Sequence, residues 1–173
     1  MYPKKEEHQI IIKIAEDENL INLNLCAKEF IDLIDDFKIN FIKKKYFILT
    51  AYNYELLVGI LIAEAKVRKI NSFDKILPKV RFYLLYVNPI FRGEQIGKKL
   101  LENYLEIQKI NGIAAVYIKL PQKYKKGIDF LKKANFSQTE KKNNKIKLEF
   151  NLWNDYGIKD YNIIDKSLKD IFE

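Results

Sequence analysis

The stretch VRFYLLYVNPIFRGEQIGKKLLENYL, from Val80 to Leu105, joins a strand-like apolar run to an amphipathic helix. The apolar run ends at Val87, and the linking segment NPIFRGEQIG carries a proline, an arginine and two glycines. At the start of a helix, unpaired backbone N–H groups and the positive end of the helix dipole converge, so such junctions commonly hold phosphate groups. This stretch therefore predicts a site for an anionic ligand.

The segments on either side alternate between strand-like and helix-like patterns, without an internal repeat. Short β-branched and aromatic runs predict strands, and apolar residues spaced three and four apart predict helices. Because the strand at 113–120 follows a crossover helix, it should lie parallel to the strand at 79–87. The predicted strands are 8–15, 46–53, 55–67, 79–87, 113–120 and 145–153, and the predicted helices are 96–110, 125–136 and one or two from 16 to about 44.

Length and composition favour a single domain spanning residues 1–173. The chain has 173 residues, of which 48% are hydrophobic, which is enough for one substantial core. Residues 152–173 have helical apolar spacing and are predicted to form a C-terminal helical extension. This extension would pack on the body of the chain or on a second subunit, so a homodimer stays open.

Cysteine and histidine are too scarce for a disulfide framework or a zinc site. Cys26 and His8 are the only residues of their types, which favours a reducing cytoplasm and predicts no bound metal. The N-terminal sequence MYPKKEEHQ is charged where a signal peptide needs an apolar core, and no apolar segment approaches the ~20 residues of a membrane span. We therefore expect a soluble cytoplasmic protein that does not associate with membranes.

The formal charge of +8 raises the question of nucleic-acid binding. Clustered Lys and Arg on one face would form a phosphate-binding footprint. Here the lysines are spread along the chain among abundant Ile, Asn and Tyr, and no nucleic-acid-binding motif is present. Composition alone accounts for the charge, so we do not expect a nucleic-acid partner.

The pattern V-x-P-x-x-R-G-x-x-I-G-K-K-L-L resembles the acyl-CoA-binding motif of the GNAT superfamily of N-acetyltransferases. The order of predicted elements from about residue 46 to residue 152 is also similar to the core of that family. The resemblance implies an α/β fold with a mixed, mostly antiparallel central sheet, a splayed parallel strand pair and flanking helices. The residues that carry it are Val87, Pro89, Arg92, Gly93, Ile96, Gly97, Lys98, Lys99, Leu100 and Leu101.

The resemblance also implies that acetyl-CoA binds as a cosubstrate. Its pantetheine arm would hydrogen-bond to the backbone of the first parallel strand, and its pyrophosphate would sit on the following loop, where glycines permit close approach. A backbone N–H near Val87 or Asn88 would then polarise the thioester carbonyl. The implied cofactor-binding residues are Leu85, Tyr86, Val87, Arg92, Gly93, Glu94, Gln95, Ile96, Gly97 and Lys98.

Two departures from the family pattern bear on the chemistry. Gln95 stands where the loop usually has its first glycine, so a backbone amide remains but a positive φ costs more. Leu131 stands where the family commonly has the tyrosine that protonates the departing thiolate. Tyr124, near the expected thiol end, is the alternative acid, and Glu64 is the nearest carboxylate for a general base. A solvent-facing role for Glu64 is the competing interpretation.

The predicted function is transfer of an acetyl group from acetyl-CoA to a primary amine by direct attack. The segments that would choose the acceptor, 20–45 and 68–78, carry no readable code. A small amine, a protein N-terminus and a lysine side chain all stay open as acceptors. A non-catalytic CoA-binding or regulatory module is the alternative, suggested by Leu131, and a basic nucleic-acid-associated protein is a third possibility.

Overall fold

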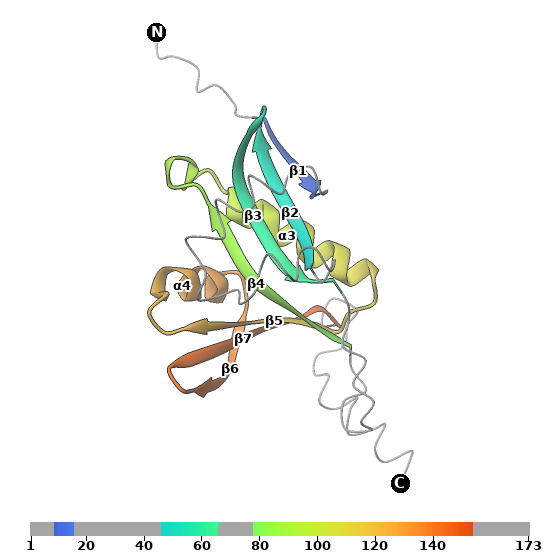
Figure 1. Ribbon diagram of the computed structural model, residues 1–173. Helices are drawn as coiled ribbons and strands as arrows, with labels where there is room; N and C mark the ends of the chain where they lie inside the picture. The colour runs from blue at the N-terminus through green and yellow to red at the C-terminus, as the bar shows by residue number, and fades with distance from the viewer. Residues whose placement is uncertain (1–8, 16–45, 66–77, 154–173) are drawn as a thin grey trace.

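The computed structural model describes residues 9–15, 46–65 and 78–153. Within these ranges the chain forms one sheet, two α-helices and a short 3-10 helix (Figure 1). The segment from 16 to about 44, most of 152–173, His8 and Cys26 lie outside the described residues. The elements are β1 (Ile10–Ile14), β2 (Tyr46–Asn53), β3 (Leu56–Glu64), β4 (Lys79–Val87), η3 (Pro89–Phe91), α3 (Ile96–Ile110), β5 (Ala115–Pro121), α4 (Lys125–Lys133), β6 (Ser137–Lys142) and β7 (Lys145–Asn151).

The sheet contains seven strands in the order β1-β2-β3-β4-β5-β7-β6. All neighbouring strands are antiparallel except β4 and β5, which run parallel. Helix α3 connects these two strands, since parallel neighbours need a crossover connection. The mixed, mostly antiparallel sheet with one parallel pair that the sequence predicts is therefore confirmed.

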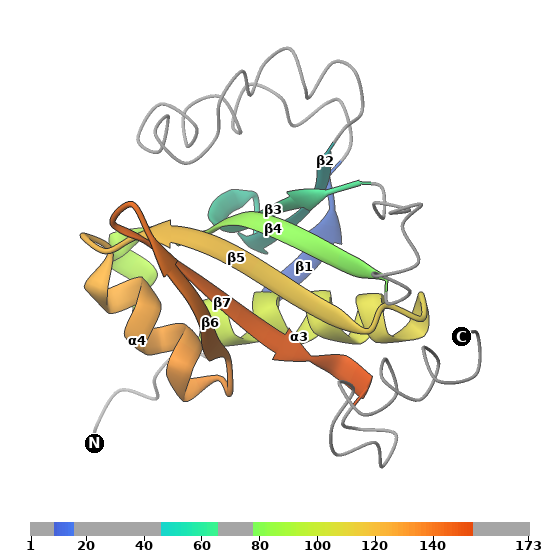
Figure 2. The same cartoon turned by 90° about the horizontal axis from the view of Figure 1, so that it is seen from below.

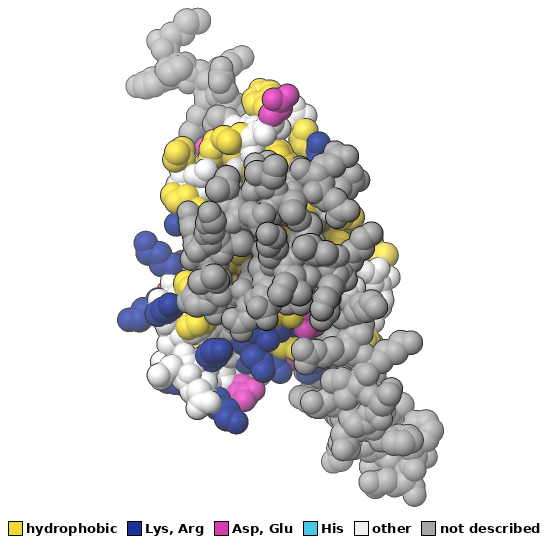
Figure 3. Space-filling model, viewed as in Figure 1, with side chains coloured by type: hydrophobic (Ala, Val, Ile, Leu, Met, Phe, Trp, Pro, Cys, Tyr) yellow, Lys and Arg dark blue, Asp and Glu magenta, His cyan; other side chains and the backbone are white. Residues whose placement is uncertain are grey.

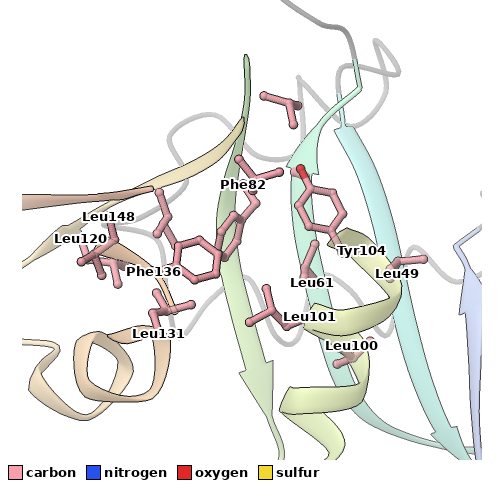
Figure 4. Packing of buried hydrophobic residues seen from close by; sticks show 14 of the residues in the cluster. Leu49, Leu61, Phe82, Leu100, Leu101, Tyr104, Leu120, Leu131, Phe136 and Leu148 are labelled. Atoms are coloured by element: carbon pink, nitrogen blue, oxygen red, sulfur yellow. The ribbon is translucent and has the colours of Figure 1, made fainter. Parts of the chain in front are cut away.

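Both helices lie on the same face of the sheet (Figure 2). The larger hydrophobic core fills the space between them and the sheet, and Phe82 of β4 is completely buried there. The centre of the Phe82 ring lies 5.8 Å from that of Tyr104 on α3 and 5.9 Å from that of Phe136, which follows α4 (Figure 4). Phe82 thus ties the packing of both helices to the strand on which the candidate site is built.

Strand β4 contributes to cores on both faces of the sheet. Phe82 belongs to the larger core, whereas Leu84 joins Ile60 and Ile62 in a smaller apolar cluster. Residues two apart on a regular strand share a face, so β4 must be irregular between these positions. The register shows the irregularity, because Leu84 pairs with Ile62 and Phe82 pairs with Ala63. Tyr83 is therefore the extra residue of a β-bulge.

This bulge coincides with the separation of the two parallel strands. Strand β4 pairs with β5 only from Lys79 to Arg81, and Tyr83 follows almost at once. A bulge bends its strand and increases the local twist. Strands β4 and β5 diverge beyond the paired residues (Figure 1). The splayed pair implied by the family resemblance is present, and the bend of β4 gives a physical reason for it.

Strand β6 is the one strand among the described residues that the sequence pattern does not predict. Its sequence, SQTEKK, has no apolar residue, and all of its side chains are exposed. It pairs with β7 through a turn at Asn143 and Asn144, which both have positive φ. Asparagine is common at such hairpin positions because it tolerates this conformation. The strands predicted from the sequence do not include this segment.

Helix α4 ends earlier than the predicted 125–136, because a Schellman motif closes it after Lys133. Asn135 has a left-handed φ of 70°. The N–H of Asn135 donates to the carbonyl of Lys132 at 3.1 Å, and the N–H of Phe136 donates to that of Leu131 at 3.0 Å. These two bonds satisfy carbonyls of the last turn. The end predicted at Phe136 is therefore wrong.

Candidate functional site

A cleft opens where β4 and β5 separate, beside helix α4. Its lining residues are mostly apolar, and Tyr83 and Tyr124 are the two among them that carry a polar side-chain group. A methyl group built on Gly127 would meet no atom within 4 Å, so the helix leaves this part of the cleft open. The lining residues are Phe82, Tyr83, Leu84 and Leu85 from β4, Ile118 and Leu120 from β5, and Tyr124, Gly127, Phe130 and Leu131 from the α4 region.

The loop between β4 and α3 presents backbone N–H groups. Gly93 has a φ of 87°, and Gln95 at the N-cap of α3 has a left-handed φ of 63°. Gln95 makes no side-chain capping bond, and the N–H of Lys99 is the first to bond back into the helix, to the carbonyl of Gln95 at 3.0 Å. The backbone N–H groups of the turn before Lys99 lie ahead of this first helical bond, so an anion can accept hydrogen bonds from them.

The backbone conformation of Gln95 shows how the loop accommodates a residue other than glycine at this position. The family pattern has glycine here, and the structure places Gln95 in the left-handed region that glycine adopts without cost. A non-glycine residue pays about 1 kcal/mol or more for this conformation. The loop therefore keeps the shape expected of the motif despite the substitution, at some cost in stability.

Gly97 lies inside α3, where its conformation does not require glycine. A methyl group built on Gly97 would lie 3.5 Å from Cγ2 of Val87 and 3.7 Å from Cζ of Phe130, which are ordinary contacts. Phe130 lines the cleft. A larger side chain at Gly97 would therefore point toward the cleft between the end of β4 and α4. The N-terminus of α3 and the cleft are thus contiguous at this position.

The side chains of the loop are mostly exposed, and Arg92 has a local role. Its Nε donates to the carbonyl of Val87 at 2.9 Å, and its guanidinium lies 5.7 Å from the centre of the Tyr86 ring. Arg92 therefore fastens the loop to the end of β4, and only the terminal nitrogens of its guanidinium can serve a ligand as well. Glu94 is exposed, whereas Ile96 is buried and offers only its backbone.

Lysines, rather than acidic residues, occupy the first turns of both helices. Lys98 and Lys99 lie in the first turn of α3, and Lys125 and Lys126 lie in that of α4. Lys98 forms an exposed pair with Glu102 at 3.9 Å. A cation opposes the helix dipole at an N-terminus, so this arrangement is unfavourable unless an anion binds nearby. Both helix starts flank the cleft region with positive charge.

Glu64 lies on β3 and bridges to the bulge of β4. Its Oε1 accepts a hydrogen bond from the hydroxyl of Tyr83 at 3.0 Å, and its Oε2 accepts one from the backbone N–H of Arg81 at 3.2 Å. The carboxylate thereby supplies an acceptor where the bulge interrupts the ladder. Glu64 is partly exposed, as the solvent-facing interpretation expects, and it is also held by these bonds.

Tyr83 lines the cleft, and its hydroxyl donates to Glu64, which is not one of the lining residues. Burial, followed by the negative charge of Glu64, raises the pKa of Tyr83 to about 12. At neutral pH the hydroxyl therefore keeps its proton and donates it to Glu64.

Tyr124 lies at the cleft, whereas the backbone N–H of Asn88 is bonded to a neighbouring strand. Tyr124 is partly exposed at the N-cap of α4 and lines the cleft, with Nζ of Lys123 at 5.2 Å from its ring centre. The backbone N–H of Asn88 instead donates to the carbonyl of Val58 at 2.8 Å. It is therefore engaged, and the expectation that it polarises a thioester carbonyl is wrong for Asn88.

Sequence reasoning missed much of the α4 side of the cleft. Gly127, Phe130 and Leu131 line it from one helical face, at spacings of three and four residues. The spacing was a usable signal, because residues three and four apart share a face of a helix. Leu131 is both buried and part of the cleft wall.

Among the residues that the structure describes, no group of three or more His, Cys, Asp or Glu side chains is arranged to hold a metal ion. Neither of the helices in these ranges combines the length and apolarity that a bilayer crossing requires.

The chain has the fold of the GNAT acetyltransferases, so the resemblance seen in the motif is confirmed at the level of the fold. It matches no protein-family model, and no curated protein sequence matches it. The similarity is instead to solved structures with low sequence identity, and it therefore rests on the three-dimensional arrangement of the elements described above.

Three of these structures illustrate the match. Arabidopsis thaliana NAA60 in complex with a bisubstrate analogue is 15% identical, with a TM-score of 0.68 over 83% of this chain and 98% of that one. The PaiA N-acetyltransferase of Thermoplasma acidophilum, in complex with coenzyme A, is 18% identical, with a TM-score of 0.63 over 83% and 99%. A GNAT-family acetyltransferase of Staphylococcus aureus Mu50 is 17% identical, with a TM-score of 0.62 over 83% and 99%.

Proposed function

We propose that this protein is an acetyl-CoA-dependent N-acetyltransferase. The observation that carries the proposal is the cleft between the splayed strands, which meets the uncapped N-terminus of α3 at Gly97 and Phe130. An apolar channel that ends at a set of backbone N–H groups suits a ligand with a long neutral arm and a pyrophosphate. Acetyl-CoA is such a ligand, and solved structures of this fold include a complex with coenzyme A.

The residues present fit the parts of this cosubstrate. Beyond Arg81, the edge of β4 has no pairing with β5, so its backbone can bond to the amides of the pantetheine arm. The N–H groups from Gly93 to Lys98 and the positive end of α3 would hold the pyrophosphate. The lysines at the two helix starts and the terminal nitrogens of Arg92 would neutralise the remaining phosphate charge.

The reaction is direct attack of an amine on the thioester carbonyl. A new C–N bond forms, the C–S bond breaks, the amine loses a proton and the thiolate of CoA gains one. We assign the base to Glu64, which takes the proton through the hydroxyl of Tyr83, since Tyr83 lines the cleft and its hydroxyl is bonded to the carboxylate. We assign the acid to Tyr124, the other hydroxyl-bearing residue that lines the cleft. No acyl-enzyme is formed.

The first expected result concerns cosubstrate binding and turnover. Saturating acetyl-CoA should raise the melting temperature by at least about 3 °C, because a ligand that binds only the native state stabilises it. Thermal denaturation monitored by circular dichroism measures this, with adenosine monophosphate as a control that lacks the pyrophosphate and the pantetheine arm. Release of free CoA thiol should then appear with at least one member of an amine and peptide panel. A folded protein whose melting temperature acetyl-CoA does not change would contradict the proposal.

A non-catalytic CoA-binding module is the second candidate. The observation in its favour is Leu131, an aliphatic residue buried in the cleft wall at the position where the family commonly carries its acid. This reading predicts the thermal shift without thiol release for any acceptor. The same two measurements therefore separate the two candidates.

A further inference from the structure

The sheet face away from α3 and α4 carries a group of charged residues to which the proposed reaction assigns no role. On β4 before its bulge, on β5 and on β7, the residues that pack in the larger core on the helix side are Val80, Phe82, Val116, Ile118, Leu120, Ile146, Leu148 and Phe150. Side chains alternate along a strand, so the residues between them lie on the opposite face. With their paired neighbours on β6, the charged and aromatic ones are Lys79, Arg81, Tyr117, Lys119, Glu140, Lys142, Lys145, Lys147 and Glu149. We call this group the sheet-face cluster.

Cations outnumber carboxylates in the sheet-face cluster. Glu149 is almost buried and pairs with Lys79 at 3.0 Å and with Lys147 at 3.7 Å. The remaining carboxylate, Glu140, lies opposite Lys147 on β6. Lys and Arg side chains gather over β5, β6 and β7 in the lower half of the view in Figure 3. The cluster therefore presents net positive charge at the surface.

Two lysines of the cluster are placed unfavourably for a protein alone. Lys119 on β5 is directly opposite Lys147 on β7. Like charges that face each other across an antiparallel pair destabilise the sheet. Lys147 is partly compensated by Glu149, but within the described ranges Lys119 is exposed and forms no ion pair. A bound anion would relieve the repulsion between the two lysines.

The cluster borders the cleft on the side opposite the helix starts. Lys119 lies between Ile118 and Leu120, which both line the cleft, and Tyr83 lines it from β4. The lysines assigned to the phosphates of CoA are on the helices, on the other face of the sheet (Figure 2). A second molecule bound to the cluster would therefore approach the cleft from the face that the cosubstrate does not use.

We propose that the sheet-face cluster binds an acidic segment of a polypeptide acceptor and so brings its amine to the cleft. This inference rests on the proposed function and specifies the class of acceptor. Charge complementarity with Lys119, Lys145 and Lys147 supports an acidic ligand. The bound segment would be an extended chain whose carboxylates face Lys119 on β5 and the two lysines of β7.

A nucleic acid fits the cluster less well than a peptide. Binding of single strands relies on aromatic rings that are free to stack on bases. Here the guanidinium of Arg81 lies 4.8 Å from the ring centre of Tyr83, and Nζ of Lys147 lies 4.7 Å from that of Tyr117. Both rings are thus faced by cations.

Fluorescence anisotropy with four labelled probes tests the proposal. The probes are a glutamate-rich, a serine-rich and a lysine-rich decapeptide, each with a free N-terminal alanine, and a single-stranded DNA oligonucleotide. We expect the glutamate-rich peptide to bind at least about tenfold more tightly than the serine-rich one at low salt. The double variant Lys119→Glu/Lys147→Glu should lower that affinity more than about fivefold, since it replaces attraction with repulsion.

The double variant Lys132→Glu/Lys133→Glu, with both substitutions at exposed positions of α4, is the control for net charge. If both double variants weaken binding equally, or if the glutamate-rich peptide binds no better than the serine-rich one, the proposal is wrong. It is also wrong if the oligonucleotide binds and the acidic peptide does not. The acetyl-CoA thermal shift, measured on the same samples, separates this failure from failure of the proposed function, since it does not depend on the cluster.

Discussion

Replacing Tyr124 with Phe is expected to lower kcat about 100-fold while leaving the affinity for acetyl-CoA within about twofold. Tyr124 is one of two hydroxyl-bearing residues in the cleft wall, and the other, Tyr83, is hydrogen-bonded to Glu64. The substitution removes the proton donor to the thiolate and keeps the ring. Steady-state thiol release with the best acceptor of the panel measures kcat, and calorimetric titration measures the affinity.

Tyr54→Phe is the matched control, because Tyr54 is 76% exposed at the β2–β3 turn and is not one of the residues that line the cleft. It should leave kcat unchanged. A parent-like kcat in Tyr124→Phe would show that the thiolate departs without a proton from this residue. The assignment of the acid would then be wrong, although the cosubstrate site would stand.

Replacing Gly97 with Asp is expected to weaken acetyl-CoA binding more than about tenfold, or roughly 1.4 kcal/mol. The new side chain would point toward Val87 and Phe130, so it would bring a negative charge to the junction of the cleft and the pyrophosphate-binding turn. The fold should survive, because the nearest atoms leave ordinary contact distances and an acidic residue is favourable in the first turn of a helix. Calorimetric titration measures the loss.

Gly97→Ala controls for size and should bind acetyl-CoA nearly as well as the parent, since a methyl group fits at this position. Raising the salt concentration should reduce the penalty in Gly97→Asp if repulsion between charges causes it. A folded Gly97→Asp protein with parental affinity would rule out the placement of the pyrophosphate at the start of α3.

The sheet and the central helix could be predicted because their patterns are local. The strand predicted at 79–87 and the helix predicted at 96–110 have the observed bounds. In the helix, Ile96, Leu100 and Tyr104 recur at spacings of four residues, and all three are buried. Strand β6 lacks any such signal, because it forms only by pairing with β7 and no side chain of it is buried.

The geometry of the site could be predicted only in part, because it depends on contacts between distant segments. The family resemblance located the loop, and the cost of a positive φ at Gln95 was recognised from its residue type. The bulge at Tyr83 and its bonds to Glu64 arise from the register between β3 and β4, which neither strand encodes alone. Likewise, the bond from Arg92 to the carbonyl of Val87 depends on how the loop folds back.

Nuclear magnetic resonance of the isotope-labelled protein, titrated with acetyl-CoA, tests the central claim most directly. It reports separately on the backbone amides of the β4 edge, of the turn and of the helices. We predict saturable shifts at Leu85 and Val87, at the amides from Gly93 to Lys98, and at Gly127 and Phe130, with little change at β1 and β2. Saturable binding whose shifts fall elsewhere, or the absence of any shift at millimolar acetyl-CoA, would contradict the assignment of this cleft as an acetyl-CoA site.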